Sequence, residues 1–331
     1  MALEISTKLL SVLIMLLLMI ENTAALKALG YYFMDASYTS LVAEYSKLDE
    51  VSIDVYSMNR KGQVSGTTPT QAMNYAAKNN QTKLFLVISN YGSSGFSSSM
   101  IHSVLSNANY RNTLMTQVIA KAIADGFNGV NIDFENVPHK DRTLLTSFVS
   151  EFSSKLHNNS LLLVMSVPPI QQDSPSDSWS GAYDYAQLGL YVDILQVMTY
   201  DEHGPWSAPG AVAGLDWVKA CINYTMSVVP KDKISMGVPA YGYIWNLLPH
   251  TGSTIFWKNL PALLKGKTVH WSNSTSSPYV KWTDSKGNHE SWFENTESIQ
   301  LKGEYARSVG IHGVSVWALG EDDPSFWDAL L

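Results

Sequence analysis

Strand-length apolar segments alternate with amphipathic helical segments along almost all of the 331 residues. Most of the apolar segments are continuous, which indicates strands covered on both faces. They are residues 28–33, 51–58, 83–90, 126–135, 161–167, 192–201, 233–243 and 313–319, and helical patterns lie between them at 69–79, 111–124, 141–157, 215–228 and 297–308. This alternation predicts an α/β fold, a (β/α)₈ TIM barrel. An open doubly wound sheet would be favoured by a Gly-rich turn after the first strand, and none is present.

The spacing breaks once, between the seventh and eighth predicted strands. Residues 244–296 fill a place where a short connection is expected. Two short aromatic segments, 279–282 and 291–293, flank a Gly-containing turn at 284–288, a pattern typical of a β-hairpin. We therefore expect one barrel over residues 26–331, with a small insertion at 244–296 that contains a hairpin.

The N-terminus has the pattern of a secretory signal. Lys8 precedes an apolar run from Leu9 to Ile20, and small residues follow up to Ala25. The run is short for a membrane span, so we expect a signal peptide over residues 1–25, with a retained N-terminal anchor as the lesser alternative. The mature protein would be secreted without stable membrane association, and associated with a cell wall or spore if the source is bacterial.

Charge and cysteine content exclude several classes of function. The formal net charge is −7 and there are no basic runs, which disfavours nucleic acid as a partner. The single cysteine, Cys221, lies in an apolar helical pattern and is interpreted as a buried hydrophobic residue. There is no zinc-type Cys/His spacing and no phosphate-binding Gly loop, so we expect no metal and no cofactor. We expect a monomer.

The fourth predicted strand carries an unusual polar row. Side chains of a strand alternate between two faces, so Asn131, Asp133 and Glu135 share one face while apolar residues fill the other. Burying such a row costs free energy unless its members are hydrogen-bonded, which favours a chemical role over a purely structural one. A half-exposed edge strand with a solvated face is the alternative.

In a TIM barrel the active site lies at the carboxyl ends of the strands. The residues at these predicted ends are Tyr31, Tyr32, Asn90, Tyr91, Asp133, Glu135, Pro168, Tyr200, Asp201, Tyr241 and Trp317. Acidic side chains surrounded by aromatic rings suit glycoside cleavage, in which a carboxylic acid protonates the leaving oxygen.

Residues 128–135, NGVNIDFE, resemble the strand-four signature DGxDxDxE of family 18 glycoside hydrolases, the chitinase family. Further matching segments occur in the expected order: ALGYY at 28–32, MTYD at 198–201, GVPAYG at 237–242 and VW at 316–317. The resemblance covers essentially the whole mature chain. Residues 132–137, 200–203, 291–294 and 317–320 are similar to the bacterial spore-cortex-lytic N-acetylglucosaminidases of this family.

The resemblance implies substrate-assisted retaining catalysis, in which the 2-acetamido group of the substrate is the nucleophile. Glu135 would be the general acid and then the general base, Asp133 would orient the acetamido group, and Tyr200 would hold its oxygen. Trp317 would form the floor under the reacting sugar. The remaining expected substrate-binding residues are Asp201, Asn131, Tyr31, Asn90 and Tyr241.

Two positions depart from the family signature. Asn128 and Asn131 stand where chitinases commonly have Asp. Asn131 could hydrogen-bond Asp133 but cannot share a proton with it, so we expect altered pH dependence. The implied substrate is a polysaccharide containing N-acetylglucosamine, with peptidoglycan favoured over chitin. A carbohydrate-binding barrel without strong activity and a chitinase or chitobiase are the alternatives.

Overall fold

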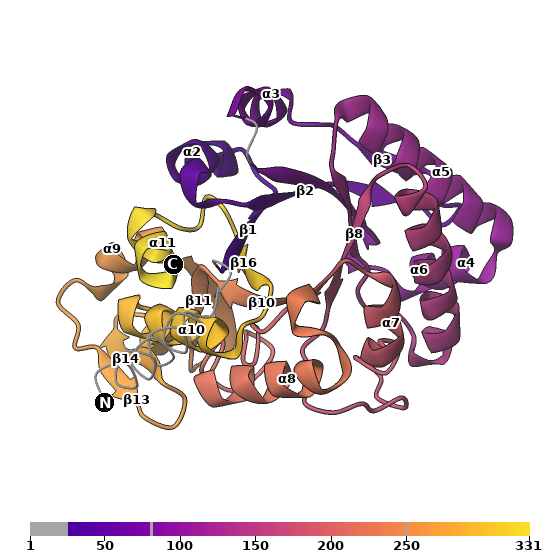
Figure 1. Ribbon diagram of the computed structural model, residues 1–331. Helices are drawn as coiled ribbons and strands as arrows, with labels where there is room; N and C mark the ends of the chain where they lie inside the picture. Colours follow the sequence, from indigo (N-terminus) through magenta and orange to yellow (C-terminus); the bar gives the residue numbers. More distant parts are fainter. Residues whose placement is uncertain (1–25, 80–81, 249) are drawn as a thin grey trace, which may run out of the picture.

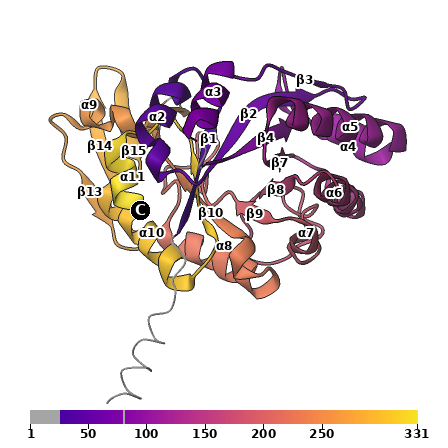
Figure 2. The same ribbon diagram turned by 45° about the horizontal axis from the view of Figure 1, so that its top comes forward.

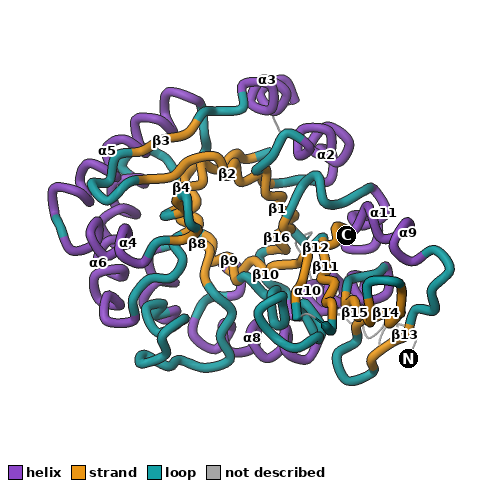
Figure 3. The backbone as a smooth tube through the Cα atoms, turned by 180° about the vertical axis from the view of Figure 1, so that it is seen from behind, coloured by secondary structure: helices purple, strands orange, loops and turns teal. Residues whose placement is uncertain are grey.

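The computed structural model describes residues 26–79, 82–248 and 250–331, so the expected signal peptide lies outside the described residues. Eight parallel strands form a closed ring, because the first strand pairs with both the second and the last (Figures 1 and 3). In their order around the ring, the strands are β1 (Lys27–Tyr32), β2 (Glu50–Met58), β4 (Lys83–Ser89), β7 (Gly129–Asp133), β8 (Leu162–Val167), β9 (Ile194–Val197), β10 (Ile234–Pro239) and β16 (Gly313–Trp317). This architecture confirms the predicted TIM barrel.

The helices of the described residues surround this ring, except α9, which belongs to the segment between β10 and β16 (Figure 2). They are α2 (Ala36–Glu44), α3 (Thr70–Asn79), α4 (Ser98–Ser106), α5 (Ala108–Asp125), α6 (Arg142–His157), α7 (Tyr185–Tyr191), α8 (Leu215–Val228), α9 (Leu260–Leu264), α10 (Thr296–Val309) and α11 (Pro324–Leu330). Within the described part of the chain, no helix is long and apolar enough to cross a membrane.

Local sequence signals set the ends of α5, which precedes β7, and of α10, which precedes β16. Asn107 caps the start of α5 by accepting hydrogen bonds from backbone amides, and Gly126 ends that helix with a left-handed φ of 77°. Asn295 and Ser298 form a capping box at the start of α10, and Gly310 ends it at φ 67°. A side-chain cap at the first turn and a left-handed glycine at the last satisfy backbone groups that a helix leaves unpaired. The chain turns at Gly126 and enters β7 three residues later.

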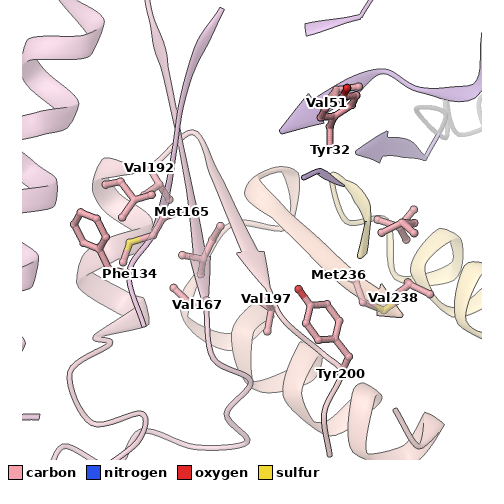
Figure 4. Packing of buried hydrophobic residues seen from close by; sticks show 14 of the residues in the cluster. Tyr32, Val51, Phe134, Met165, Val167, Val192, Val197, Tyr200, Met236 and Val238 are labelled. Atoms are coloured by element: carbon pink, nitrogen blue, oxygen red, sulfur yellow. The ribbon is translucent and has the colours of Figure 1, made fainter. Parts of the chain in front are cut away.

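Strand β7 separates an apolar face from a polar one. Val130, Ile132 and the following Phe134 are fully buried in the large apolar cluster that also includes barrel and helix residues. Figure 4 shows Phe134 among other members of this cluster. Asn131 and Asp133 are on the opposite face, which points into the barrel, where Asn131 is hydrogen-bonded to Tyr31 of β1. The predicted alternation of the two faces is therefore present in the folded chain.

The segment between β10 and β16 forms a second sheet. Five antiparallel strands occur in the order β12, β11, β15, β14, β13, where the sequence had indicated only a hairpin. They are β11 (Tyr241–Asn246), β12 (Thr251–Phe256), β13 (His270–Ser272), β14 (Ser277–Asp284) and β15 (Gly287–Trp292). The expected hairpin corresponds to β14 and β15. β12 and β13 lack a strong alternating pattern in the sequence. They are defined by the pairing of β12 with β11 and of β13 with β14.

Three smaller strands lie outside these two sheets' main bodies. β3 (Val64–Gly66) pairs antiparallel with the end of β2. β5 (Tyr91–Gly92) and β6 (Gly95–Phe96) form a tight hairpin directly after β4. The Ser-rich segment 93–99 contributes to this hairpin and to the start of α4, where the Ser97 hydroxyl accepts a hydrogen bond from the Met100 amide.

Candidate active site

A cavity of about 480 Å³ opens at the carboxyl ends of the barrel strands. Seven of the nine residues that the sequence suggested for the site line it: Glu135, Asp133, Tyr200, Trp317, Asp201, Tyr31 and Tyr241. The other two, Asn131 and Asn90, are fully buried and do not line it. The cavity therefore brings together two carboxylates from the end of β7 and aromatic residues from four other strands or their loops.

Glu135 is held in place through its backbone. The amide N–H of Glu135 donates to Oδ1 of Asn90 at 2.9 Å, and Nδ2 of Asn90 donates to the Glu135 carbonyl at 2.8 Å. The preceding carbonyl, that of Phe134, accepts a 2.6 Å hydrogen bond from the Tyr183 hydroxyl. Asn90 was expected to contact substrate. In the structure both ends of its amide are hydrogen-bonded to the backbone of Glu135, and its side chain does not line the cavity.

Burial and neighbouring charges raise the pKa of both carboxyl groups at the end of β7. Burial raises the pKa of Glu135 to about 7, and the charges of Asp201 and Asp54 act in the same direction. Burial also raises the pKa of Asp133 well above its ordinary value, and the charges of Glu135 and Asp54 add to that effect. Oδ1 of Asp133 is buried and has no hydrogen-bond partner among the described residues. The site therefore holds a glutamic acid that retains its proton near neutral pH.

Asn131 lies one layer below the cavity. Its Nδ2 donates to the Tyr31 hydroxyl at 2.9 Å and to Oγ of Ser52 at 3.0 Å, while its Oδ1 accepts from Ser166 at 3.3 Å. The sequence suggested that it binds substrate and hydrogen-bonds Asp133. The structure corrects this, because both ends of the amide are used within the barrel interior.

The position of Tyr200 depends on the neighbouring Gly237. A Cβ atom on Gly237 of β10 would lie 2.7 Å from the Val197 carbonyl oxygen and 2.8 Å from Cε1 of Tyr200. Only a residue without a side chain allows the two strand ends to come this close. The Tyr200 ring is buried against Tyr241, with their ring centroids 6.3 Å apart.

Asp201 is fixed by two tyrosines of the inserted sheet. Its Oδ1 accepts hydrogen bonds from the hydroxyl groups of Tyr241 at 2.6 Å and Tyr243 at 2.8 Å. Burial raises the pKa of Asp201, and the two hydroxyl groups partly offset this by stabilising the anion. Asp201 has φ 63°, a left-handed conformation uncommon for a residue with a side chain. The insertion thus completes one wall of the site.

Trp317 forms an aromatic stack at the mouth of the barrel. Its ring stacks on Phe33 with a centroid distance of 5.1 Å and lies 5.3 Å from the ring of Tyr31. Half-buried aromatic surface beside carboxyl groups suits an apolar sugar face. Phe33 was not among the expected site residues, although it directly follows the tyrosine pair that was.

Two further acids were missed: Glu321 lines this cavity, and Asp54 lines an adjoining one. Glu321 lines the cavity from the loop after β16, and its buried Oε2 has no hydrogen-bond partner among the described residues. Burial raises the pKa of Glu321 to about 8. Asp54 lies on β2, and burial raises the pKa of its carboxyl group to about 6. An isolated acid within the apolar run 51–58 was the available sequence signal for Asp54.

Within the described residues, no group of three or more His, Cys, Asp or Glu side chains is arranged to hold a metal ion. Residues 22–322 match the model of glycosyl hydrolases family 18. The chain belongs to this family. The family 18 match spans all eight barrel strands and the inserted sheet, so it includes every residue of the cavity described above.

Known proteins of similar sequence include an uncharacterized glycosylase of Bacillus subtilis, YvbX, which is 36% identical over 94% of this chain and 92% of that protein. The cortical fragment-lytic enzyme of Bacillus subtilis is 27% identical, covering 78% of this chain and 62% of that enzyme. Among solved structures, a chitinase from Chromobacterium violaceum has a TM-score of 0.88 at 30% identity, covering 92% of this chain and 98% of the chitinase. The family 18 chain is therefore a glycosidase related to cortex-lytic enzymes and chitinases.

Proposed function

We propose that this family 18 glycosidase is secreted and cleaves the β-1,4 bond that follows an N-acetylglucosamine residue, by substrate-assisted retaining catalysis. The observation that carries the proposal is the position of Glu135. Its carboxyl group lines the cavity beside Asp133, and its pKa of about 7 keeps a proton available at neutral pH. A general acid is most effective when its pKa lies near the working pH.

The residues of the site suit each step of this reaction. Glu135 donates its proton to the glycosidic oxygen as the bond to the anomeric carbon breaks, and the acetamido oxygen of the substrate forms a bond to that carbon. Asp133 accepts a hydrogen bond from the acetamido N–H, using the carboxylate that lacks a full set of partners in the structure. Tyr200 holds the acetamido oxygen. Glu135, now a carboxylate, takes a proton from the water that attacks the anomeric carbon, and the bond between that carbon and the acetamido oxygen breaks, which restores the acetamido group.

The aromatic stack and Asp201 bind the reacting sugar. Trp317, supported by Phe33, presents its ring to the apolar face of the reacting sugar. Asp201 has one carboxylate oxygen committed to Tyr241 and Tyr243, which leaves the other for sugar hydroxyl groups. We place Tyr31 and Tyr241 at the wall of the same subsite, because both line the cavity.

Peptidoglycan is the substrate we propose first, because a cortical fragment-lytic enzyme is among the relatives. Chitin-type glycans are the second candidate, because the chitinase from Chromobacterium violaceum has nearly the same fold over the same length. Both polymers contain the acetamido sugar that the mechanism needs. Digestion of spore cortex, vegetative cell wall and chitin in parallel, with mass analysis of the products, separates the two.

The experiment that tests the proposal is the substitution Glu135→Gln. Glutamine has nearly the same shape but no proton of suitable acidity, so we expect the release of reducing ends to fall by at least ~10³-fold. The matched control is Glu304→Gln, on the exposed face of α10, which should leave the rate unchanged. Wild-type activity of Glu135→Gln on both peptidoglycan and chitooligosaccharides would refute the proposal.

Secretion has its own test. Residues 1–25 carry the signal pattern, so expression of the whole chain in a secreting host should give an extracellular protein whose mass corresponds to cleavage near Ala25. Recovery of the uncleaved chain in the cell membrane would support the N-terminal anchor instead.

A further inference from the structure

An irregularity in strand β2 displaces Asp54. The register between β2 and β4 runs from Ile53 opposite Leu86 to Tyr56 opposite Ile88, so β2 has one residue more than its neighbour over this stretch. Such a bulge re-aims a side chain and is common beside active sites. Here the extra residue falls at Asp54 or its neighbour Val55, in the middle of β2 and directly after Ile53, which pairs with Tyr32 at the carboxyl end of β1.

The displaced Asp54 side chain borders the site. It lines a second cavity of about 410 Å³ together with Ser89, which lies opposite Asp133 in the sheet register. This cavity and the one that contains Glu135 share Phe33, Phe96 and Trp317, so the two adjoin across the aromatic stack. Neither cavity is lined by a Lys, Arg or His side chain among the described residues.

Asp54 has no partner that would explain its place in the barrel. No hydrogen bond or ion pair to its carboxyl group occurs among the described residues, and burial alone accounts for its raised pKa. Asp54 is half-buried, and a carboxyl group without a partner is unfavourable at such a position in the barrel, so its presence suggests use. Asp133 is in a similar position, because its Oδ1 is also unpartnered while Asn131 below it is fully engaged elsewhere.

We propose that Asp54 is a positioning residue for the reaction: it is the third carboxyl group of the site and acts on Asp133 and Glu135 across the barrel mouth. This inference rests on the proposed function of Glu135. The negative charge of Asp54 keeps the Glu135 proton in place before the substrate binds, a task that the neutral Asn131 cannot perform. Its charge raises the pKa of both Asp133 and Glu135, which agrees with this role.

The described side chains that face Asp54 carry no positive charge that would offset its effect on Glu135. The titratable side chains around it are Asp133 and Glu135 at the end of β7, Tyr31 on β1, Tyr56 on β2 and Tyr91 on β5. All of these are acids or neutral tyrosines. Like charges close to one another disfavour simultaneous ionisation, so removing Asp54 makes it easier for Glu135 to lose its proton.

The test is the pH dependence of kcat/KM for Asp54→Asn on a chitooligosaccharide. Asparagine keeps the shape and removes the charge. We expect the basic limb of the profile to move toward lower pH by on the order of one unit, which is about a tenfold loss of kcat/KM above the limb and little loss near pH 5. Asp54→Ser, a smaller neutral variant, should move the limb in the same direction.

Asp216→Asn is the control, because it removes the same charge from the exposed first turn of α8. It should leave the limb in place. An unmoved limb in both Asp54 variants, with folding verified by thermal melting, would overturn the inference. The proposed function fails separately, through retained activity of Glu135→Gln, so the two failures are distinguishable.

Discussion

The side-chain amide of Asn90 spans the peptide units on both sides of Glu135: it accepts a hydrogen bond from the Glu135 N–H and donates one to the Glu135 carbonyl. Strand β7 ends at Asp133, so Glu135 lies beyond the strand hydrogen bonds that would otherwise fix its backbone. One fully buried amide at the end of β4 replaces them.

We predict that Asn90→Ala lowers kcat by about 10- to 100-fold, because small displacements of a catalytic group are costly. The substitution also removes the three hydrogen bonds of the Asn90 side chain, two to Glu135 and one to the Ser97 carbonyl, and should lower the free energy of unfolding by about 1–3 kcal/mol. Asn79→Ala, which removes an exposed amide bonded to the Tyr75 carbonyl, is the control. Unchanged kcat in Asn90→Ala would show that Glu135 does not need this support.

The pH dependence of the wild-type enzyme follows from Glu135. General acid catalysis needs its protonated form, and its raised pKa is about 7. We predict that kcat/KM falls as pH rises through about 7, and the measurement is a pH profile on a soluble chitooligosaccharide. A glutamic acid at its ordinary pKa would instead place the basic limb between about pH 4 and 5, and a limb there would contradict the electrostatic account.

Glu321 should govern the stability of the fold in alkaline solution. Its pKa in the folded protein is about 8, above the ordinary value of 4.5. Its contribution to stability is therefore complete below pH 4.5 and is lost as pH rises through 8. We predict that Glu321→Gln gains stability relative to wild type between pH 5 and pH 9, by on the order of 5 kcal/mol at most. Denaturant unfolding at the two pH values measures this, and parallel curves would refute it.

Substitution of Gly237 tests whether the position of Tyr200 matters for catalysis. The Cβ of alanine would meet the Val197 carbonyl oxygen and the Tyr200 ring at distances that require one of them to move. We predict that Gly237→Ala costs about 1–3 kcal/mol of stability and lowers kcat more than it raises KM. Gly92→Ala is the control, because its added carbon would meet Met100 at an ordinary 3.5 Å. Equal kinetic effects of the two substitutions would argue against a role for the Tyr200 position.

Much of the barrel could be predicted because each of its strands is a short apolar run and adjacent helices have clear periodicity. The helix predicted at 215–228 has the observed bounds of α8, and the strand predicted at 83–90 differs from β4 by one residue. The inserted sheet was underestimated because β12 and β13 lack such runs. Their positions depend on the pairing of β12 with β11 and of β13 with β14, which is a tertiary property.

The site was predictable where residues lie at strand ends and less so elsewhere. Strand alternation places Asp133 and Asn131 on one face, but it does not reveal that the Asn131 amide is used by Tyr31, Ser52 and Ser166. Asp54 was missed because a bulge, which depends on the neighbouring strand, brings it to the site. Glu321 was missed because it lies four residues beyond the end of β16, where the loop path decides which side chains face the cavity.

The stereochemistry of the first product tests the central claim most directly. ¹H NMR of a chitooligosaccharide digest, recorded before the anomers of the product interconvert, shows which anomer the enzyme releases. Attack by the acetamido oxygen followed by water inverts the anomeric carbon twice, so we predict the β-anomer. Initial release of the α-anomer would mean direct displacement by water, and would contradict the mechanism proposed for Glu135 and Asp133.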